Sequence, residues 1–236
     1  MTVVDLQSYA AVARPKLIIF DFDGTLAETE AMAAEIISNK LAAQGLNLEP
    51  DEIARTLSGV PKEKDQPLLE QLLGVRLHES FMDEVRAEWR AGVSAGLAPT
   101  NGALETLKWL PIPFCVASNA SRADLIQRMR ATRLFGLIGS RFFSSDDVGL
   151  RKPDPAVFLL AAEAMGVEPH ECLVIEDSVA GCEAARRAQM RYCAFVGARH
   201  QSTRMRAELE GYEPEALFFD LRELGHFLDL ATVSRG

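Results

Sequence analysis

Residues 16–26, Lys-Leu-Ile-Ile-Phe-Asp-Phe-Asp-Gly-Thr-Leu, form a short apolar run that stops at two aspartates. The run Leu17–Phe20 is typical of a strand that is covered on both faces, as in a parallel sheet flanked by helices. Ligands of such sheets bind beyond the carboxyl ends of the strands. Because side chains two positions apart on an extended chain point the same way, Asp21 and Asp23 should face one small volume. Two carboxylates this close need a cation or a shared proton.

The composition limits the kind of protein to which these aspartates belong. The 236 residues include 48% hydrophobic and 25% charged residues, which is typical of a folded protein with one large or two small domains. The 34 acidic residues outnumber the 25 basic ones, and the net charge of -9 disfavours nucleic acid or an anionic membrane as a partner. A small anionic substrate in a local basic pocket is compatible with this charge.

The cysteines and the N-terminal segment indicate the compartment. Cys115, Cys172, Cys182 and Cys193 are widely spaced and form no C-x-x-C pair, which favours buried, reduced thiols. No basic segment leads into a long apolar one, and no run approaches the roughly 18 apolar residues of a membrane span. We therefore expect a soluble, cytoplasmic protein. We also expect a monomer or a weak homodimer, although neither feature bears on the oligomeric state.

A long helical segment follows the aspartates before the next strand. Apolar residues recur at helical spacing, and Gly45 is a plausible end of the first helix. The expected helices are at residues 28–44, 50–57, 61–73 and 79–95. Because this segment contains no strand-like run, we expect it to form a separate helical cap domain at residues 28–98.

From residue 99 onward, strand-like and helix-like segments alternate. This alternation predicts an α/β fold with a doubly wound parallel sheet. Residues 1–27 and 99–236 would then form a Rossmann-like catalytic core. After the first strand, the expected strands are at residues 114–117, 141–143, 172–175, 192–196 and 216–219.

Four predicted strand or loop ends carry chemistry, and each also has a plainer structural explanation. A D-G-T sequence such as residues 23–25 is commonly a turn followed by a helix cap. With a second aspartate before it, one carboxylate can attack phosphorus while the other acid protonates the leaving oxygen and then activates water.

Ser118 and Asn119 could donate hydrogen bonds to a phosphoryl group, or form a turn or cap. Ser121 with Asp124 is a better capping pair, which leaves Ser118 for another role.

The other two segments supply a cation and two more acids. Lys152 is solvated in the plain interpretation, whereas in the functional one it neutralises the acidic cluster and holds phosphate. Glu176 and Asp177 end a strand, where Ser178 could simply cap the next helix. Hard oxygen ligands from separate strand ends suit Mg²⁺.

With these four segments in this order, the chain resembles the haloacid dehalogenase superfamily, in the branch of phosphatases and β-phosphoglucomutase-like members with an inserted helical cap. The resemblance covers nearly the whole chain and rests on Asp21–Leu26, Ser118, Lys152 and Glu176–Asp177. It implies that Asp21 is the nucleophile and Asp23 the general acid and base. Ser118 and Lys152 would orient the phosphoryl group and the nucleophile.

The resemblance also implies a Mg²⁺ cofactor. Asp21, the backbone carbonyl of Asp23 and Asp177 would bind the ion, with help from Glu176 through water.

Substrate contacts are expected in the core and in the cap. Thr25 and Asn119 lie in the core motifs. In the cap, residues 58–62 interrupt the helices, so Gly59 and Lys62 are candidates, although Lys62 is equally compatible with a solvated charged face. A cap that closes over the substrate excludes water and determines which substrate is accepted.

The residues also narrow the reaction. Dehalogenases and phosphonate-cleaving members lack the second aspartate, so Asp23 favours phosphate-ester cleavage. The β-phosphoglucomutase-like members typically carry a histidine where this chain has Ala33, which weakens the mutase interpretation.

We expect a Mg²⁺-dependent phosphatase that hydrolyses small phosphorylated metabolites, such as sugar phosphates, through an aspartyl-phosphate intermediate. A sugar phosphomutase is the first alternative, and a phosphorylated signalling switch that is not an enzyme is the second. No G-x-G-x-x-G follows the first strand, which disfavours a dinucleotide-binding protein.

Overall fold

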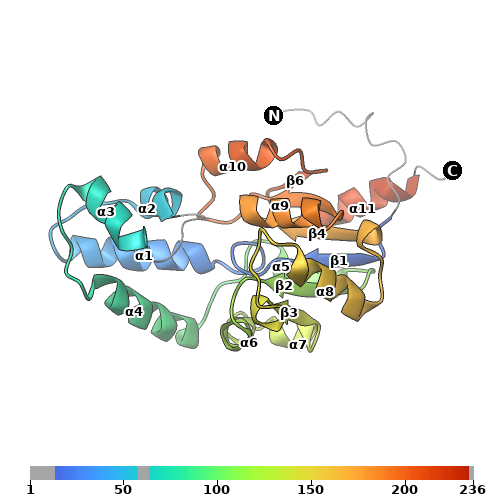
Figure 1. Ribbon diagram of the computed structural model, residues 1–236, viewed down its shortest axis with the longest axis horizontal. Coiled ribbons are helices and arrows are strands. Elements are labelled where there is room, and N and C mark those ends of the chain that lie inside the picture. Colours follow the sequence, from blue (N-terminus) through green and yellow to red (C-terminus); the bar gives the residue numbers. More distant parts are fainter. Residues whose placement is uncertain (1–13, 58–63, 234–236) are drawn as a thin grey trace.

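A parallel sheet forms the centre of the molecule. The computed structural model describes residues 14–57 and 64–233, and in this part of the chain six strands pair in the order β3-β2-β1-β4-β5-β6, all parallel. The prediction of a doubly wound α/β fold is therefore confirmed (Figure 1). The strands are β1 (Leu17–Phe20), β2 (Phe114–Ser118), β3 (Phe142–Ser144), β4 (Cys172–Glu176), β5 (Arg191–Phe195) and β6 (Leu217–Phe218).

Alternate side chains of β1 pack into two different apolar layers. Leu17 and Ile19 contact the helices α8 (Ala156–Met165) and α9 (Val179–Arg187) on one face. Ile18 and Phe20 join the layer on the other face. That layer is built from α5 (Ala103–Trp109), α6 (Arg122–Ala131), α7 (Phe135–Ile138) and α11 (Glu223–Val233). Because both faces are covered, β1 is wholly apolar, as the sequence predicted.

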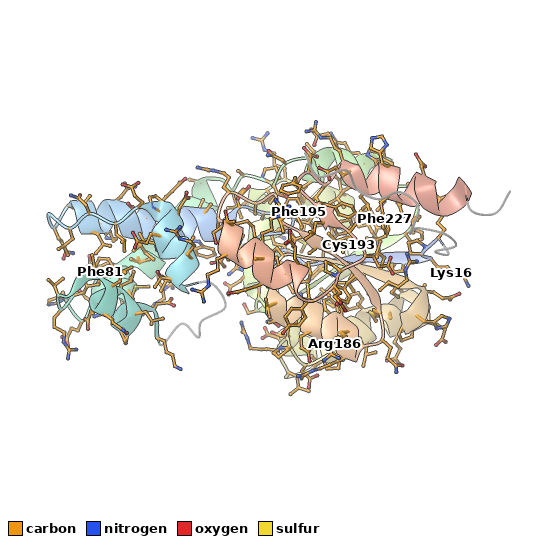
Figure 2. The ribbon with its side chains drawn as sticks, turned by 90° about the horizontal axis from the view of Figure 1, so that it is seen from above. Lys16, Phe81, Arg186, Cys193, Phe195 and Phe227 are labelled. Carbon is orange, nitrogen blue, oxygen red and sulfur yellow. The ribbon has the colours of Figure 1, made fainter. Side chains whose placement is uncertain are left out.

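Four helices form a bundle with an apolar cluster of its own, beyond the end of the sheet at which β1 finishes (Figure 1). They are α1 (Thr29–Ala42), α2 (Pro50–Leu57), α3 (Asp65–Leu73) and α4 (Phe81–Ala95). Figure 2 shows Phe81 inside this bundle, well separated from Phe195 and Cys193 in the sheet region. The chain passes between the two regions at Ala27 and Pro99, which pair in an isolated bridge. The predicted domain limits at 27/28 and 98/99 stay a prediction.

Two helices were not predicted from the sequence. The four-residue α7 is too short to show a helical period, whereas α11 has a readable one, because Leu224, Phe227 and Leu228 recur at helical spacing and are buried. The helix α10 (Thr203–Glu210) follows β5 as expected. Within residues 14–57 and 64–233, every helix is too short or too polar to span a bilayer.

Candidate active site

Lys152 lies at the centre of the predicted site. Its ammonium group donates to Asp21 Oδ1 at 2.5 Å, to Glu176 Oε1 at 2.7 Å and to the carbonyl of Ala117 at 2.9 Å. Its side chain is only 2% exposed and lies over the ring of Phe158, at 4.5 Å from the ring centre. The ends of β1, β2 and β4 therefore converge on one buried cation, and the plain interpretation of Lys152 as a solvated residue is wrong.

Asn119 fixes the loop that carries Lys152. Its side-chain oxygen accepts from the backbone N–H of Lys152 at 2.8 Å, and its amide nitrogen donates to the carbonyl of Lys152 at 3.4 Å. The backbone carbonyl of Asn119 accepts from the hydroxyl of Ser145 at 3.0 Å. Both ends of the amide are occupied, so the structure gives Asn119 a role in loop positioning, and its predicted contact with substrate stays a prediction.

Glu176 uses both carboxylate oxygens within the protein. Oε1 receives Lys152, whereas Oε2 accepts the backbone N–H groups of Asp177 and Ser178 and the hydroxyl of Ser178, each within 2.9 Å. A Cβ at Gly181 would lie 1.8 Å from the carboxyl carbon of Glu176, so only glycine leaves room for this side chain at the start of α9. Ser178 caps α9 by accepting from the N–H of Gly181, which is the role that the plainer interpretation of this segment gave it.

Asp177 lies directly against the loop that follows β1. Its Oδ1 accepts from the hydroxyl of Thr25 at 3.3 Å, and its Oδ2 lies 3.3 Å from Nε2 of His200. Gly24 has a φ of +84°, and a Cβ there would lie 2.0 Å from Oδ2 of Asp177. This position therefore requires glycine for its backbone conformation and for the close approach of the two loops. Thr25, a predicted substrate contact, is fully buried against Asp177.

Asp23 makes a separate ion pair. Its Oδ2 accepts from a terminal guanidinium nitrogen of Arg128 at 2.5 Å, and the hydroxyl of Ser118 donates weakly to the same oxygen at 3.5 Å. Ser118 also accepts from the N–H of Ala120, and Ser121 caps α6 as predicted. The second aspartate thus has its own cation, supplied by α6 rather than by a strand end.

Burial and the neighbouring charges set the protonation of this cluster. Burial raises the pKa of Asp21, against the opposing charge of Lys152. It also raises the pKa of Asp23, which Arg128 opposes. The pKa of Asp177 rises to about 6, again through burial, with His200 acting against the rise. Burial would lower the pKa of Lys152, but the charge of Asp21 and that of Glu176 raise it overall, so this lysine is ionised at neutral pH.

The donor set fits a hard divalent cation. Four carboxylates, those of Asp21, Asp23, Glu176 and Asp177, face two permanent cations, those of Lys152 and Arg128, among the described residues. The excess negative charge and the oxygen donors suit Mg²⁺. In that same part of the chain, no three acidic, histidine or cysteine side chains converge into a metal site by themselves. This is compatible with the ligands predicted from the sequence, because they include the backbone carbonyl of Asp23 as well as side chains. Mg²⁺ also usually keeps several water ligands.

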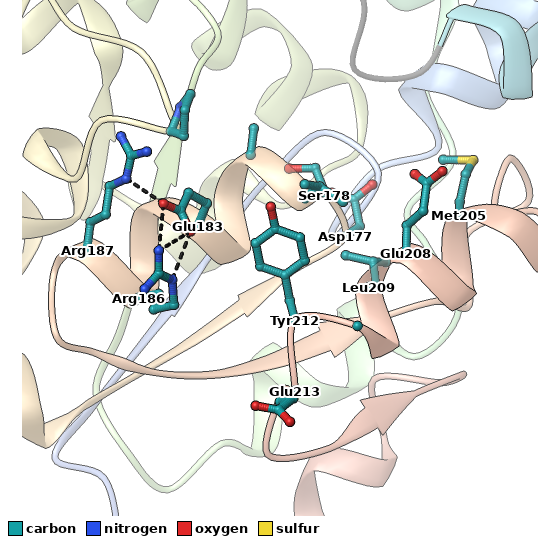
Figure 3. Close-up of a pocket in the computed structure, with 14 residues that line it drawn as sticks. Asp177, Ser178, Glu183, Arg186, Arg187, Met205, Glu208, Leu209, Tyr212 and Glu213 are labelled. Carbon is teal, nitrogen blue, oxygen red and sulfur yellow. Dashed lines mark hydrogen bonds and ion pairs between the residues drawn. The ribbon is translucent and has the colours of Figure 1, made fainter.

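Two hollows lie near this cluster, one at Asp177 and the other at its neighbour His200. A groove of about 770 Å³ begins at Asp177 and Ser178 and continues between α9 and α10 past the ring of Tyr212 (Figure 3). A smaller recess of about 310 Å³ lies where α1 and α2 of the bundle meet Arg199 and His200. Gly59 and Lys62, the predicted cap contacts, lie outside the described residues.

Sequence reasoning missed two residues of the site, Arg128 and His200. Arg128 is one arginine of a polar helix, and nothing in its local sequence marks it. His200 follows β5, and loops that follow parallel strands gather at one edge of the sheet, so its position offered a weak signal. Its neighbour Gln201 donates to the carbonyl of Asp177 at 2.8 Å, which fixes this loop at the site.

The fold and the site together define a class of protein. A doubly wound α/β core carries Asp21 directly after its central strand, paired with a buried lysine, with further acids nearby and a helical bundle after that strand. This arrangement is typical of enzymes with a parallel α/β sheet that carry carboxylates at the ends of their strands.

The chain belongs to the haloacid dehalogenase-like hydrolases, whose family model matches residues 15–189. It is 28% identical over 190 residues to 6-phosphogluconate phosphatase of Escherichia coli, covering 80% of this chain and 86% of that protein. It is 30% identical over 216 residues to a phosphorylated carbohydrates phosphatase of Thermotoga maritima, covering 88% and 98%.

A solved structure of similar shape is a HAD family hydrolase from Deinococcus radiodurans with bound phosphate and sodium. Its TM-score is 0.86 at 29% identity, with 94% of this chain and 98% of that chain covered. These findings confirm the predicted family and the predicted class of enzyme, a hydrolase of the HAD-like phosphatase type.

Proposed function

We propose that this protein is a Mg²⁺-dependent phosphatase that hydrolyses small phosphorylated metabolites of the sugar-phosphate type through an aspartyl-phosphate on Asp21. The observation that carries the proposal is the bond from Lys152 to Asp21 Oδ1 at 2.5 Å, in a site where the lysine is wholly buried. A buried cation fixes one oxygen of the carboxylate, so the other oxygen is directed to its target.

The proposed reaction has two steps. In the first, a carboxylate oxygen of Asp21 forms a bond to phosphorus while the bond from phosphorus to the ester oxygen breaks, and Asp23 gives its proton to that oxygen. In the second, Asp23 takes a proton from water, whose oxygen attacks phosphorus and releases inorganic phosphate and Asp21. Ser118 and Lys152 would orient the phosphoryl group.

Mg²⁺ would be held by Asp21, Asp177 and the carbonyl of Asp23, and would neutralise charge that accumulates on the phosphoryl oxygens. The excess of carboxylates over cations supports this assignment. Thr25 and His200 would orient Asp177 through the contacts described above. Glu176 would act mainly by holding Lys152, since its oxygens are already engaged.

The proposed substrate class rests on the recess beside the bundle and on the relatives. The recess of about 310 Å³ is lined by three carboxylates, by Arg199 and His200, and by alanine and proline side chains. Its charged and polar groups suit the hydroxyl groups of a sugar. The two curated relatives described above are phosphatases of a phosphorylated sugar acid and of phosphorylated carbohydrates. We propose that residues 28–98 act as the cap that contacts the part of the substrate beyond phosphate, including residues 58–62.

The test is a panel of phosphate esters, measured with and without Mg²⁺, using wild-type protein and the variants Asp21→Asn and Asp23→Asn. We expect turnover only with Mg²⁺, and a loss of at least about 10²-fold in both variants. Asp83→Asn, at an exposed ion pair of α4, is the matched control and should keep wild-type turnover. Near wild-type turnover in Asp21→Asn would refute the nucleophile assignment.

The same panel separates the alternatives. A hexose 1-phosphate that is converted to its isomer indicates a phosphomutase, whereas free inorganic phosphate indicates the phosphatase. Release of many phosphates per protein molecule excludes a signalling switch, in which the phosphoryl group would stay on the protein.

A further inference from the structure

Arg128 connects the proposed acid to the helical bundle. Its guanidinium donates to Asp23 Oδ2 at 2.5 Å on one side, and on the other its central carbon lies 4.7 Å from the ring centre of Trp89 in α4. The side chains of Arg128 and Asp23 are 16% and 18% exposed. An arginine held between a carboxylate and an indole ring has little freedom to turn.

The fold fixes both ends of this contact. Leu125 and Met129, on the buried face of α6, set the rotation of the helix, and Arg128 then lies on the adjoining face, toward α4. The indole nitrogen of Trp89 donates to the carbonyl of Thr29 at 3.4 Å, at the first residue of α1. The ring against which Arg128 stacks is therefore held by the bundle, at the point where the bundle joins the loop that carries Asp23.

We propose that Arg128 is a positioning residue for Asp23. Arg128 holds the carboxyl group of Asp23 in the orientation from which this group can protonate the leaving oxygen. Trp89 of α4 provides the aromatic surface that holds Arg128 in place. This inference rests on the proposed function, in which Asp23 is the acid and base. Arg128 contacts Asp23 directly, so its proposed effect on the reaction requires no contact between Arg128 and the substrate.

The consequence depends on the leaving group. When an alkyl phosphate is cleaved, the departing oxygen is strongly basic and needs the proton of Asp23 as the bond to phosphorus breaks. When p-nitrophenyl phosphate is cleaved, the phenolate is a weak base and departs without a proton. A misplaced Asp23 should therefore slow the cleavage of the alkyl phosphate. It should leave the formation of the aspartyl-phosphate from p-nitrophenyl phosphate almost unchanged.

The experiment measures kcat/KM of full-length Arg128→Gln with the best alkyl phosphate from the panel and with p-nitrophenyl phosphate. This parameter reports only the steps up to release of the alcohol or phenol, which excludes the later hydrolysis that both substrates share. We expect a loss of about 10²-fold for the alkyl ester and of no more than roughly threefold for the aryl ester. Arg128→Lys, which keeps the charge, should recover part of the alkyl activity.

Three further variants make the result specific. Arg130→Gln changes an arginine of the same helix that stacks on Phe135, and should change neither value. Trp89→Leu removes the aromatic surface and should reproduce the selective loss in weaker form, whereas Trp89→Phe should retain most alkyl activity. If Arg128→Gln does not fold, as judged by circular dichroism, Arg128→Lys and the Trp89 pair carry the test.

Several outcomes would overturn the inference. An equal loss for both esters means that Arg128 acts on phosphoryl binding or on the fold, and no loss for either means that Asp23 is positioned without it. If Arg128→Gln raises only the KM, and only for phosphate esters whose alcohol part carries a carboxylate group, then Arg128 binds the substrate directly. A wild-type protein that cleaves neither ester overturns the proposed function and this inference together, whereas an unchanged ratio of the two esters overturns the inference alone.

Discussion

Replacing Lys152 with methionine should destabilise the protein severely, because the ammonium group is the shared partner of two buried carboxylates. Asp21 and Glu176 have side-chain exposures of 9% and 1%, and Lys152 bonds to each at 2.7 Å or less. Removing one partner of a buried ion pair costs about 3–5 kcal/mol, since the charge left behind has neither water nor a counter-ion. With two carboxylates left behind, we expect a cost near the upper end, against a total stability of about 5–15 kcal/mol.

The structure also predicts how this cost can be recovered. Glu176 keeps its bonds to the N–H groups of Asp177 and Ser178, so Glu176→Gln removes charge without emptying the space that the side chain fills. The double variant Lys152→Met with Glu176→Gln should therefore be more stable than the sum of the single changes predicts, by about 1 kcal/mol or more. Only Asp21 would then remain as an unpaired buried charge.

The assay is urea unfolding followed by far-UV circular dichroism, with EDTA present so that no divalent ion replaces the lysine. Lys108→Met, at an exposed lysine of α5, is the matched control and should shift stability by no more than about 0.5 kcal/mol. A loss smaller than about 1 kcal/mol in Lys152→Met would refute the description of this lysine as the central counter-ion.

Three further predictions concern other parts of the molecule. His200→Gln should weaken Mg²⁺ binding by about 10–100-fold in isothermal titration calorimetry, because the histidine orients Asp177, and an unchanged affinity would contradict this. The bond from Arg122 lowers the pKa of Asp147, so the ionised carboxylate stabilises the fold above the unfolded pKa, and this stabilisation is lost as the pH falls through the folded pKa. Asp147→Asn should thus cost a few tenths to about 1 kcal/mol at pH 7, and progressively less as the pH is lowered through the acidic range; a cost in urea unfolding that does not fall with pH would be inconsistent with it. Burial raises the pKa of Cys172 to about 11, so this thiol should react with Ellman's reagent at pH 8 only after unfolding, and rapid labelling of the folded protein at Cys172 would count against the structure.

The central strand and its acids could be predicted because the information is local. Four apolar residues followed by aspartates identify β1 and its end, and the same pattern identifies β4 with Glu176 and Asp177. Parallel strands of one sheet end at the same edge, so the meeting of these acids follows once the strands are recognised. The ends of the strands were predicted less accurately: the strand expected at residues 172–175 extends to Glu176 in the structure.

The partners of these acids could not be predicted in the same way. Arg128 reaches Asp23 across 105 positions in the sequence, from a helix whose rotation is set by which of its apolar residues are buried. His200 lies in a loop whose path depends on bonds from Gln201 and Arg199 to distant residues. Asn119 was predicted to contact the phosphoryl group or the substrate, and its bonds to the backbone of Lys152 depend on a loop geometry that no periodicity encodes.

The distribution of the cations is consistent with the different roles that we propose for two aspartates so close in sequence. Lys152, from a loop, neutralises the first, and Arg128, from a helix that faces the bundle, neutralises the second. The two ion pairs share no donor, so in the proposed reaction each carboxylate would keep its own partner. Of the two cations, Arg128 also touches the bundle, so a change in the bundle should reach the proposed acid and leave the bond between Lys152 and the proposed nucleophile intact. In the proposed mechanism the nucleophile is therefore held by residues at the end of the sheet, whereas the acid is held both by the sheet and by the helical bundle.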